Sequence, residues 1–292
     1  MRKRFAKNKL NSLLLLAPTL LLSAIFIYGV VNGILQGFGY MPFLGKTQLT
    51  AEYYLKALSR PDFLRSLGFS LKIALVSSSL SLILGVVLSV LLLHARAGKV
   101  SRLISLGLPL LSAHTIVALF MVSLFSGAGL ISRVLAQFGL ISEPSQFSSI
   151  VGQPGGLGII LVYLWKEAPF IAFVTLAIME NISQKYQESA ALLGASPLVS
   201  FFTVTLPLMY PTLAKAFIIV FAFALGSYEI PALLGPTAPK ALAELAYMEF
   251  QNPDLLNRPY AMAINGLIAG ITILLTLLYF KILSKEDKAA LL

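Results

Sequence analysis

The chain has 292 residues, of which 58% are hydrophobic and only 12% are charged, and its mean hydropathy is +0.86. A soluble domain would carry about a quarter charged residues, so this composition indicates a membrane protein. The absence of cysteine excludes a disulfide framework, a thiolate nucleophile and a cysteine-based metal site. The formal net charge of +10 could indicate nucleic-acid binding. Because the basic residues cluster at the ends of apolar segments, membrane topology explains the charge and no nucleic-acid partner is expected.

The apolar residues fall in runs long enough to cross a bilayer. A helix needs roughly 20 residues to span a ~30 Å hydrocarbon core. The predicted spans are residues 13–35, 70–93, 103–125, 156–179, 212–234 and 260–283. We therefore predict an all-α membrane protein with six transmembrane helices. A single transmembrane domain, 13–283, lies between an N-terminal tail, 1–12, and a C-terminal tail, 284–292.

Basic residues set the predicted orientation. Five of them precede the first span, namely Arg2, Lys3, Arg4, Lys7 and Lys9. The loop after the second span carries Arg96, Lys99 and Arg102. Lysine and arginine mark cytoplasmic segments, so both termini are predicted to lie in the cytoplasm. A signal peptide is the competing interpretation of the N-terminus, but the apolar run is too long and lacks a clean cleavage site.

No motif for catalysis is present in the sequence. The sequence lacks HExxH, GxSxG and Walker A patterns, and the glycine-rich tract 152–158 does not fit a phosphate loop. The two histidines, His94 and His114, are expected at different depths, and a packing role near Pro109 is favoured for His114 over a functional one. We therefore expect no catalytic residue, no metal site and no cofactor bound by this chain. The protein is not expected to be an enzyme.

Residues 180–210 form the long stretch of the second half that cannot be a membrane span. It contains the sequence YQESAALLGASPLVSFFTVTLP, from Tyr186 to Pro207. Good helix formers precede Gly194, and glycine adopts positive φ without strain, which ends a helix. Ser196 and Pro197 then fit an N-cap and a first helical position. The pattern predicts a helix–turn–helix at the membrane surface.

The spacing within this stretch resembles the EAA loop of ABC importer permeases of the MetI-like superfamily. That loop reads Glu-Ala-Ala, three residues, Gly, nine residues, Ile-x-Leu-Pro. Here the sequence has Glu188, Ser189 and Ala190, then Gly194, then Val204-Thr205-Leu206-Pro207. Ser189 replaces the first alanine and Val204 replaces isoleucine. An ordinary amphipathic connector is the alternative, but it would not require these distances.

The resemblance implies a fold, a mechanism and partners. The fold is the six-helix bundle of a type I ABC importer permease in the cytoplasmic membrane of a bacterium or archaeon. The implied partners are a cytoplasmic ATPase dimer that uses ATP and Mg, an extracytoplasmic substrate-binding protein, and a second permease, either a sister chain or a copy. The implied coupling residues are Tyr186, Glu188, Ser189, Ala190, Gly194, Ala195, Val204, Leu206 and Pro207. ATP-driven closure of the ATPase pair would draw the loops together.

A second resemblance concerns the substrate. Residues 226–235, GSYEIPALLG, look like the G-x-x-x-x-P-x-L-L-G segment of spermidine/putrescine-type permeases and their relatives. This implies a polyamine or a related small solute such as thiamine, a phosphonate, iron(III) or an oxyanion. The segment is less specific than the loop.

Polar residues within the spans are the candidates for the substrate path. They are Ser227, Tyr228, Glu229, Asn265, Lys166 and Glu167. Intramembrane charges are costly and usually functional. Glu229 could line the pore or could pair with Lys166 for packing, and both readings stay open. Lys166 and Glu167 are adjacent and should point about 100° apart on a helix. We expect Pro169 to unwind this region.

An ion-gradient-driven secondary transporter is the alternative function. It predicts internal repeats and paired broken helices. No convincing repeat relates the two halves of the sequence, and such a carrier does not need an EAA loop. Co-purification with an ATPase separates the two functions.

Overall fold

The computed structural model describes residues 2–95, 98–143, 146–192 and 194–289. These residues are nearly all helical, and the only β pairing among them is an isolated bridge between Met41 and Lys46. Six helical stretches are long and apolar enough to cross a membrane, as predicted. The chain divides into two compact units. The first comprises the residues up to Arg60 together with Ala246–Ala269, and the second comprises Pro61–Leu245 together with the residues from Gly270 onward.

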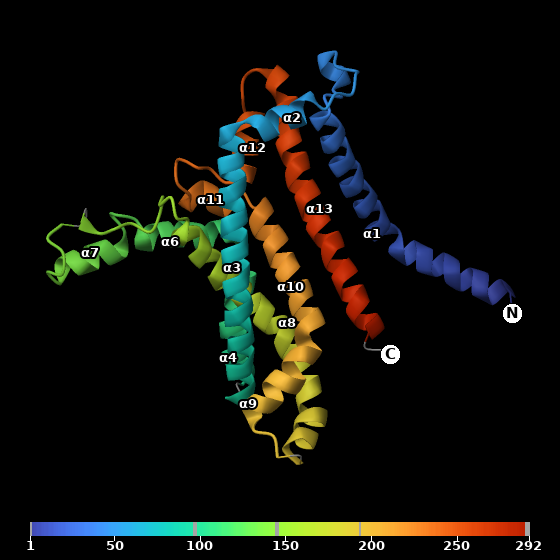
Figure 1. Ribbon diagram of the computed structural model, residues 1–292, viewed down its shortest axis with the longest axis vertical. Coiled ribbons are helices and arrows are strands. Elements are labelled where there is room, and N and C mark those ends of the chain that lie inside the picture. Colours follow the sequence, from blue (N-terminus) through green and yellow to red (C-terminus); the bar gives the residue numbers. More distant parts are fainter. Residues whose placement is uncertain (1, 96–97, 144–145, 193, 290–292) are drawn as a thin grey trace. The chain divides into compact units, whose positions relative to one another are not determined.

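The first unit combines the N-terminal part of the chain with a later segment, Ala246–Ala269. Its helices are α1 (Arg2–Gly37), a 3₁₀ turn (Pro42–Leu44), α2 (Glu52–Ser59), the end of α12 (Leu242–Phe250), a 3₁₀ turn (Leu255–Asn257) and the first part of α13 (Arg258–Ala289). The Tyr54 hydroxyl of α2 donates a hydrogen bond to the Ile34 carbonyl of α1, 3.3 Å away. A Cβ on Gly37 would come within 3.0 Å of the Ala263 backbone, so glycine permits α1 and α13 to approach closely there. The helix α2 thus ties together the ends of α1 and α13 (Figure 1).

The second unit contains the remaining helices. They are α3 (Pro61–His94), α4 (Lys99–Arg102), a π-helical turn (Leu103–Gly107), α5 (Leu108–Leu111), α6 (His114–Phe125), α7 (Leu130–Gln137), α8 (Leu157–Leu192), α9 (Pro197–Ser200), a second π turn (Phe201–Thr205), α10 (Leu206–Gly226), α11 (Glu229–Leu234), the start of α12 and the rest of α13 from Gly270. Helices α3, α8 and α10 pack along one another, whereas α6 and α7 run across the direction of α3 (Figure 1).

Small residues bring α3 and α8 close together. Ser77, Ser78 and Ser81 of α3 are fully buried. A Cβ on Gly85 would lie 2.7 Å from the Ile171 side chain, so only glycine allows this approach. Small residues at a helix interface permit tight packing within a membrane, where apolar burial alone provides little driving force. This contact fixes the position of the central part of α8, which carries the charged pair.

Two sequence expectations about the spans differ from the structure. Pro169 was expected to unwind the helix around Trp165, and this is wrong because α8 is helical from Leu157 to Leu192 with Pro169 inside it. Neighbouring helices in a membrane can satisfy the carbonyl that a proline frees. The predicted third span, 103–125, is interrupted at Ser112 and Ala113, which are extended with ψ of 137° and 142°.

Candidate functional site

The turn between α8 and α9 has the local chemistry that the sequence predicts. Gly194 adopts φ of +83°, in the left-handed region that favours glycine. The Ser196 hydroxyl accepts a hydrogen bond from the Val199 N–H at 3.3 Å, and Pro197 occupies the first turn of α9. A helix–turn–helix therefore forms, in which the first helix is the end of α8 itself. The backbone of Glu188, Ser189 and Ala190 belongs to α8, and their side chains lie outside what the structure describes.

Several apolar side chains at this turn are exposed. Leu192 is 90% exposed, Leu198 is 72% exposed and Tyr186 is about half exposed. Ala195, within the turn, is partly buried. Clustered exposed apolar side chains mark a surface that another protein or the membrane covers. The geometry fits the docking of a partner on this turn.

The residues that follow the turn form a π-helical turn before Pro207. The Leu206 N–H donates to the Phe201 carbonyl, five residues earlier, rather than to the residue four earlier. Proline has no N–H and its ring would clash with the carbonyl four residues before it, which is that of Thr203. The wider turn separates these groups. Val204, Leu206 and Pro207, all predicted as coupling residues, thus lie at a π turn that connects α9 to α10.

Four of the six predicted substrate-path residues lie where two membrane helices break, namely Lys166, Ser227, Tyr228 and Glu229. One break is the extended Ser112–Ala113 segment between α5 and α6, and the other lies at Ser227 between α10 and α11, with ψ of 135°. The Thr115 hydroxyl, in the first turn of α6, donates to Glu229 Oε2 at 2.8 Å, in the first turn of α11. This hydrogen bond joins the two helices that follow the breaks. Glu229 is exposed.

Lys166 and Glu167 point to different partners, as their adjacency on a helix predicts. The Lys166 ammonium donates to the Ser112 carbonyl, which the break leaves without a helical N–H. Glu167 is buried and accepts a hydrogen bond from Ser81 at 3.2 Å, while its Oε1 has no partner. Among the described residues no ion pair joins Glu229 to Lys166. Lys166 therefore stabilises the break, and Glu167 belongs to the α3–α8 interface.

Ser227 and Tyr228 lie at the second break, directly before Glu229, and Tyr228 is exposed. Asn265 belongs to the first unit, where it lines an apolar cavity of about 340 Å³ with Gly29 and Gly33 of α1. The structure thus brings Glu229 together with residues of α6 and assigns Asn265 to a separate cavity.

Sequence reasoning missed Ser112 and Thr115 as site residues. Their signal was weak, since each is a single hydroxyl in an otherwise apolar run. His114 lies between them in the sequence, and its ring centroid is 4.7 Å from that of Phe223 on α10, with the two rings tilted by 35°. This contact fits the packing role favoured for His114. Polar residues that interrupt a predicted span on both sides of a histidine could have indicated the break.

Comparisons with known proteins identify relatives across most of the chain. Residues 81–286 match the family model described as "Binding-protein-dependent transport system inner membrane component". The chain is 27% identical over 298 residues to the sulfoquinovosyl glycerol transport system permease protein SmoG of Agrobacterium fabrum, covering 96% of this chain and 92% of the relative. It is 24% identical to the sulfate transport system permease protein CysT of Salmonella typhimurium, covering 78% of this chain and 79% of that protein.

A solved structure shares the fold. It is a chain of a bacterial ABC transporter involved in the import of the acidic polysaccharide alginate, with a TM-score of 0.76 and 22% identity. The likeness covers 96% of this chain and 98% of that chain.

Proposed function

The chain belongs to the family of binding-protein-dependent transport system inner membrane components, and from this premise we propose that the α8–α9 turn transmits the action of a cytoplasmic ATPase to the breaks in the membrane helices. The protein is a multi-pass permease component of an ABC importer in the cytoplasmic membrane, not an enzyme, and ATP hydrolysis belongs to the partner ATPase. A second permease and a substrate-binding protein complete such an importer.

The observation that carries the coupling proposal is the exposed turn at Gly194. The exposed apolar side chains of Leu192 and Leu198 lie on either side of Gly194 in the sequence. Gly194 has a positive φ that only glycine adopts readily. The turn is continuous with α8 on one side and, through the π turn, with α10 on the other. A movement imposed on the turn would therefore reach Lys166 on α8 and Glu229 beyond α10, since rigid helices transmit such motions.

A substitution of Gly194 tests this role. Gly194→Val places a β-branched side chain at φ of +83° and should lose ATP-dependent uptake by more than tenfold, because the turn can no longer present Leu192 and Leu198. Uptake and co-purification with the ATPase are measured in proteoliposomes. Gly98→Val is the matched control, since Gly98 has open space around it and no positive φ. Retention of docking and uptake by Gly194→Val would remove the turn from the coupling mechanism.

The structure gives less direct support for the identity of the substrate than for the coupling role of the turn. The exposed Glu229 carboxylate is held by a neutral hydroxyl and no cation pairs with it among the described residues. If Glu229 faces the substrate path, repulsion disfavours an oxyanion such as sulfate. We therefore propose a neutral, hydroxyl-rich solute. The trehalose/maltose transport system permease protein MalF of Thermococcus litoralis, 28% identical to this chain over 249 residues, is named for solutes of this class. A cationic solute such as a polyamine is the second candidate, favoured by the same carboxylate, although the relatives named above transport other solutes.

The substitution Glu229→Gln separates these classes. A cationic substrate should lose at least tenfold in uptake, because its attraction to the carboxylate disappears. A neutral hydroxyl-rich substrate should lose only a few-fold, since an amide still accepts and donates hydrogen bonds. Uptake is measured with a panel containing a polyamine, thiamine, sulfate and a glycoside. An increase in sulfate uptake with no other change would identify an oxyanion importer and contradict the proposal.

A further inference from the structure

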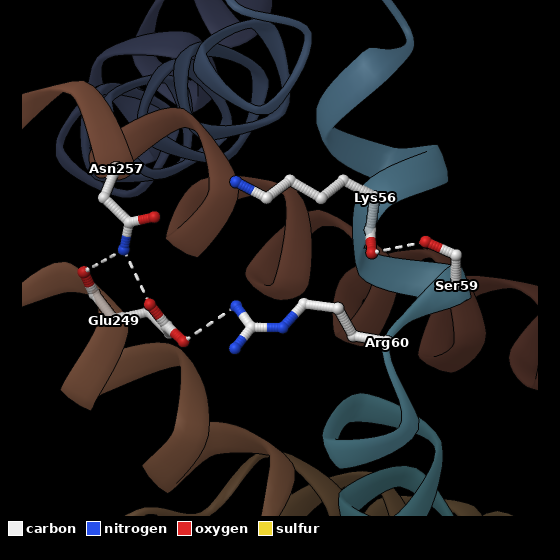
Figure 2. Close-up of polar contacts among 5 residues, drawn as sticks. All are labelled: Lys56, Ser59, Arg60, Glu249 and Asn257. Carbon is white, nitrogen blue, oxygen red and sulfur yellow. Dashed lines mark hydrogen bonds and ion pairs between the residues drawn. The ribbon is translucent and has the colours of Figure 1, made fainter.

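Three basic side chains gather in the first unit, where α2 meets the start of α13. The Lys56 ammonium lies 5.3 Å and the Arg60 guanidinium carbon 5.0 Å from the centre of the Tyr260 ring, which is buried. Arg258, two residues before Tyr260, lies over Phe250 at 4.8 Å. An aromatic face attracts a cation, so these rings hold the basic groups in place. Figure 2 shows Lys56 and Arg60 extending from α2 and the residue that follows it toward Glu249 and Asn257.

The cluster has more positive than negative charge. Among the described residues, the one ion pair of the cluster joins Arg60 to Glu249, with one nitrogen and one oxygen 3.3 Å apart. Glu249 also accepts a hydrogen bond from Asn257 at 2.6 Å. Within the described part of the chain, no carboxylate pairs with Lys56 or with Arg258. The Arg258 Nε atom is buried without a hydrogen-bond acceptor. These basic groups therefore retain the capacity to bind an anion.

Two further acidic residues of the unit form no ion pair with these basic groups. Asp254 accepts the Leu256 N–H and caps the 3₁₀ turn. Glu52 lies one turn before Lys56 on α2 but forms no ion pair with it. The Tyr54 hydroxyl adds no charge, because burial raises its pKa above the usual value.

The cluster lies at the level where membrane-spanning helices end. The span of α1 ends at Gly37 and the span that contains α13 begins at Leu255. Helix α2 is bound to the end of α1 through Tyr54, and Lys56 of α2 lies over a ring of α13. Basic and aromatic residues at span ends are characteristic of the headgroup region. A basic cluster at this depth therefore faces phosphate groups.

Exposed leucines surround the basic groups. Leu55 is 65% and Leu58 is 45% exposed on α2, and Leu256 is 57% exposed on the neighbouring 3₁₀ turn. A short helix with exposed leucines beside basic side chains is typical of an element that lies in the membrane interface, with its apolar residues among the upper acyl chains. An acidic protein surface would satisfy the basic groups but would leave these leucines in a polar setting. A lipid satisfies both.

We propose that Lys56, Arg60 and Arg258 form a binding site for the phosphate of an anionic phospholipid, with Leu55, Leu58 and Leu256 against its acyl chains. This goes beyond the transport function, which concerns the α8–α9 turn and the helix breaks. The lipid would hold α2 against the ends of α1 and α13. Arg60 contributes while it remains bonded to Glu249, since a guanidinium has further N–H donors.

The test uses the full-length chain in detergent and native mass spectrometry, with phosphatidylglycerol and phosphatidylcholine titrated in parallel. The wild type should bind phosphatidylglycerol more tightly, and the preference should fall as salt rises. Lys56→Gln and Arg258→Gln should each weaken phosphatidylglycerol binding by about fivefold, because each basic residue near an anionic surface contributes about that factor. Arg65→Gln is the matched control, since Arg65 is already paired with Asp62 at 2.7 Å.

Each outcome decides the proposal. Equal binding of the two lipids by the wild type, or unchanged phosphatidylglycerol binding in both variants, would overturn it. Lys56→Arg keeps the charge and should keep the preference, which separates charge loss from misfolding. If Lys56→Gln and Arg258→Gln instead weaken capture of the substrate-binding protein while lipid binding is unchanged, the cluster is a protein-docking surface. Because no ATPase or uptake is measured, the result is independent of the coupling proposal.

Discussion

Two segments of the second unit share a local structure and then diverge. Residues 99–111 and 197–209 each begin with a four-residue α turn, which a five-residue π turn and the sequence Leu-Pro-Leu follow. In both, the N–H before the proline donates five residues back, Leu108 to Leu103 and Leu206 to Phe201. The first helix then ends at Leu111, whereas the second continues to Gly226.

The difference between the two segments lies in their surroundings. After Leu111 the chain meets Lys166, whose ammonium satisfies the Ser112 carbonyl and so permits the helix to stop. After Met209 the chain continues with Leu213, Ala216 and Val220, which are buried in the core of the unit. A proline thus dictates the turn immediately before it, but the tertiary partner decides whether the helix continues.

Among the substitutions that test this difference between the two segments, removal of the Lys166 ammonium should have the largest effect on stability and uptake. Lys166→Met leaves the Ser112 carbonyl without a donor in a membrane helix, at a cost of about 1–3 kcal/mol. We expect a lower unfolding temperature in detergent and a loss of uptake of more than tenfold. Lys215→Met, which removes an exposed lysine from α10, should leave both measurements unchanged. Wild-type stability and uptake in Lys166→Met would mean that the break does not depend on this lysine.

Local chemistry explains which features could be predicted from sequence. The number of spans follows from hydropathy, and the turn at Gly194 follows from the types of three nearby residues, Gly194, Ser196 and Pro197. The divergence of Lys166 and Glu167 follows from helix geometry alone.

The features that could not be predicted depend on distant partners. The break at Ser112 requires a lysine 54 residues later, and the Thr115–Glu229 hydrogen bond joins residues 114 apart. The continuity of α8 through Pro169 likewise depends on neighbouring helices rather than on the proline itself. The sequence therefore predicts the candidate substrate-path residues as a set of polar residues, while their pairings required the structure.

Restoration of a regular helix at the second π turn should have an intermediate effect. Pro207→Ala supplies an N–H that can donate to the Thr203 carbonyl, so the π turn can become an α turn. Because an α turn accommodates one residue fewer than a π turn, this conversion would rotate α9 by about 100° relative to α10. Leu198 would then point in a different direction. We expect ATPase activity in the reconstituted importer to persist while uptake per ATP falls several-fold. Unchanged uptake per ATP would show that the rotation of α9 carries no signal.

The matched change at the first π turn should have the smallest effect, because less of the chain depends on it. Pro109→Ala would rotate only α4, which carries Arg102, and would move its guanidinium away from Glu180, now 2.5 Å distant. Both side chains of this pair are partly exposed, and such pairs contribute about 0–1 kcal/mol. A small fall in unfolding temperature with normal uptake per ATP is therefore expected, measured beside Pro207→Ala under the same conditions. If Pro109→Ala lowers uptake per ATP as much as Pro207→Ala does, the two π turns act as equivalent joints, and the tertiary partners would not distinguish them.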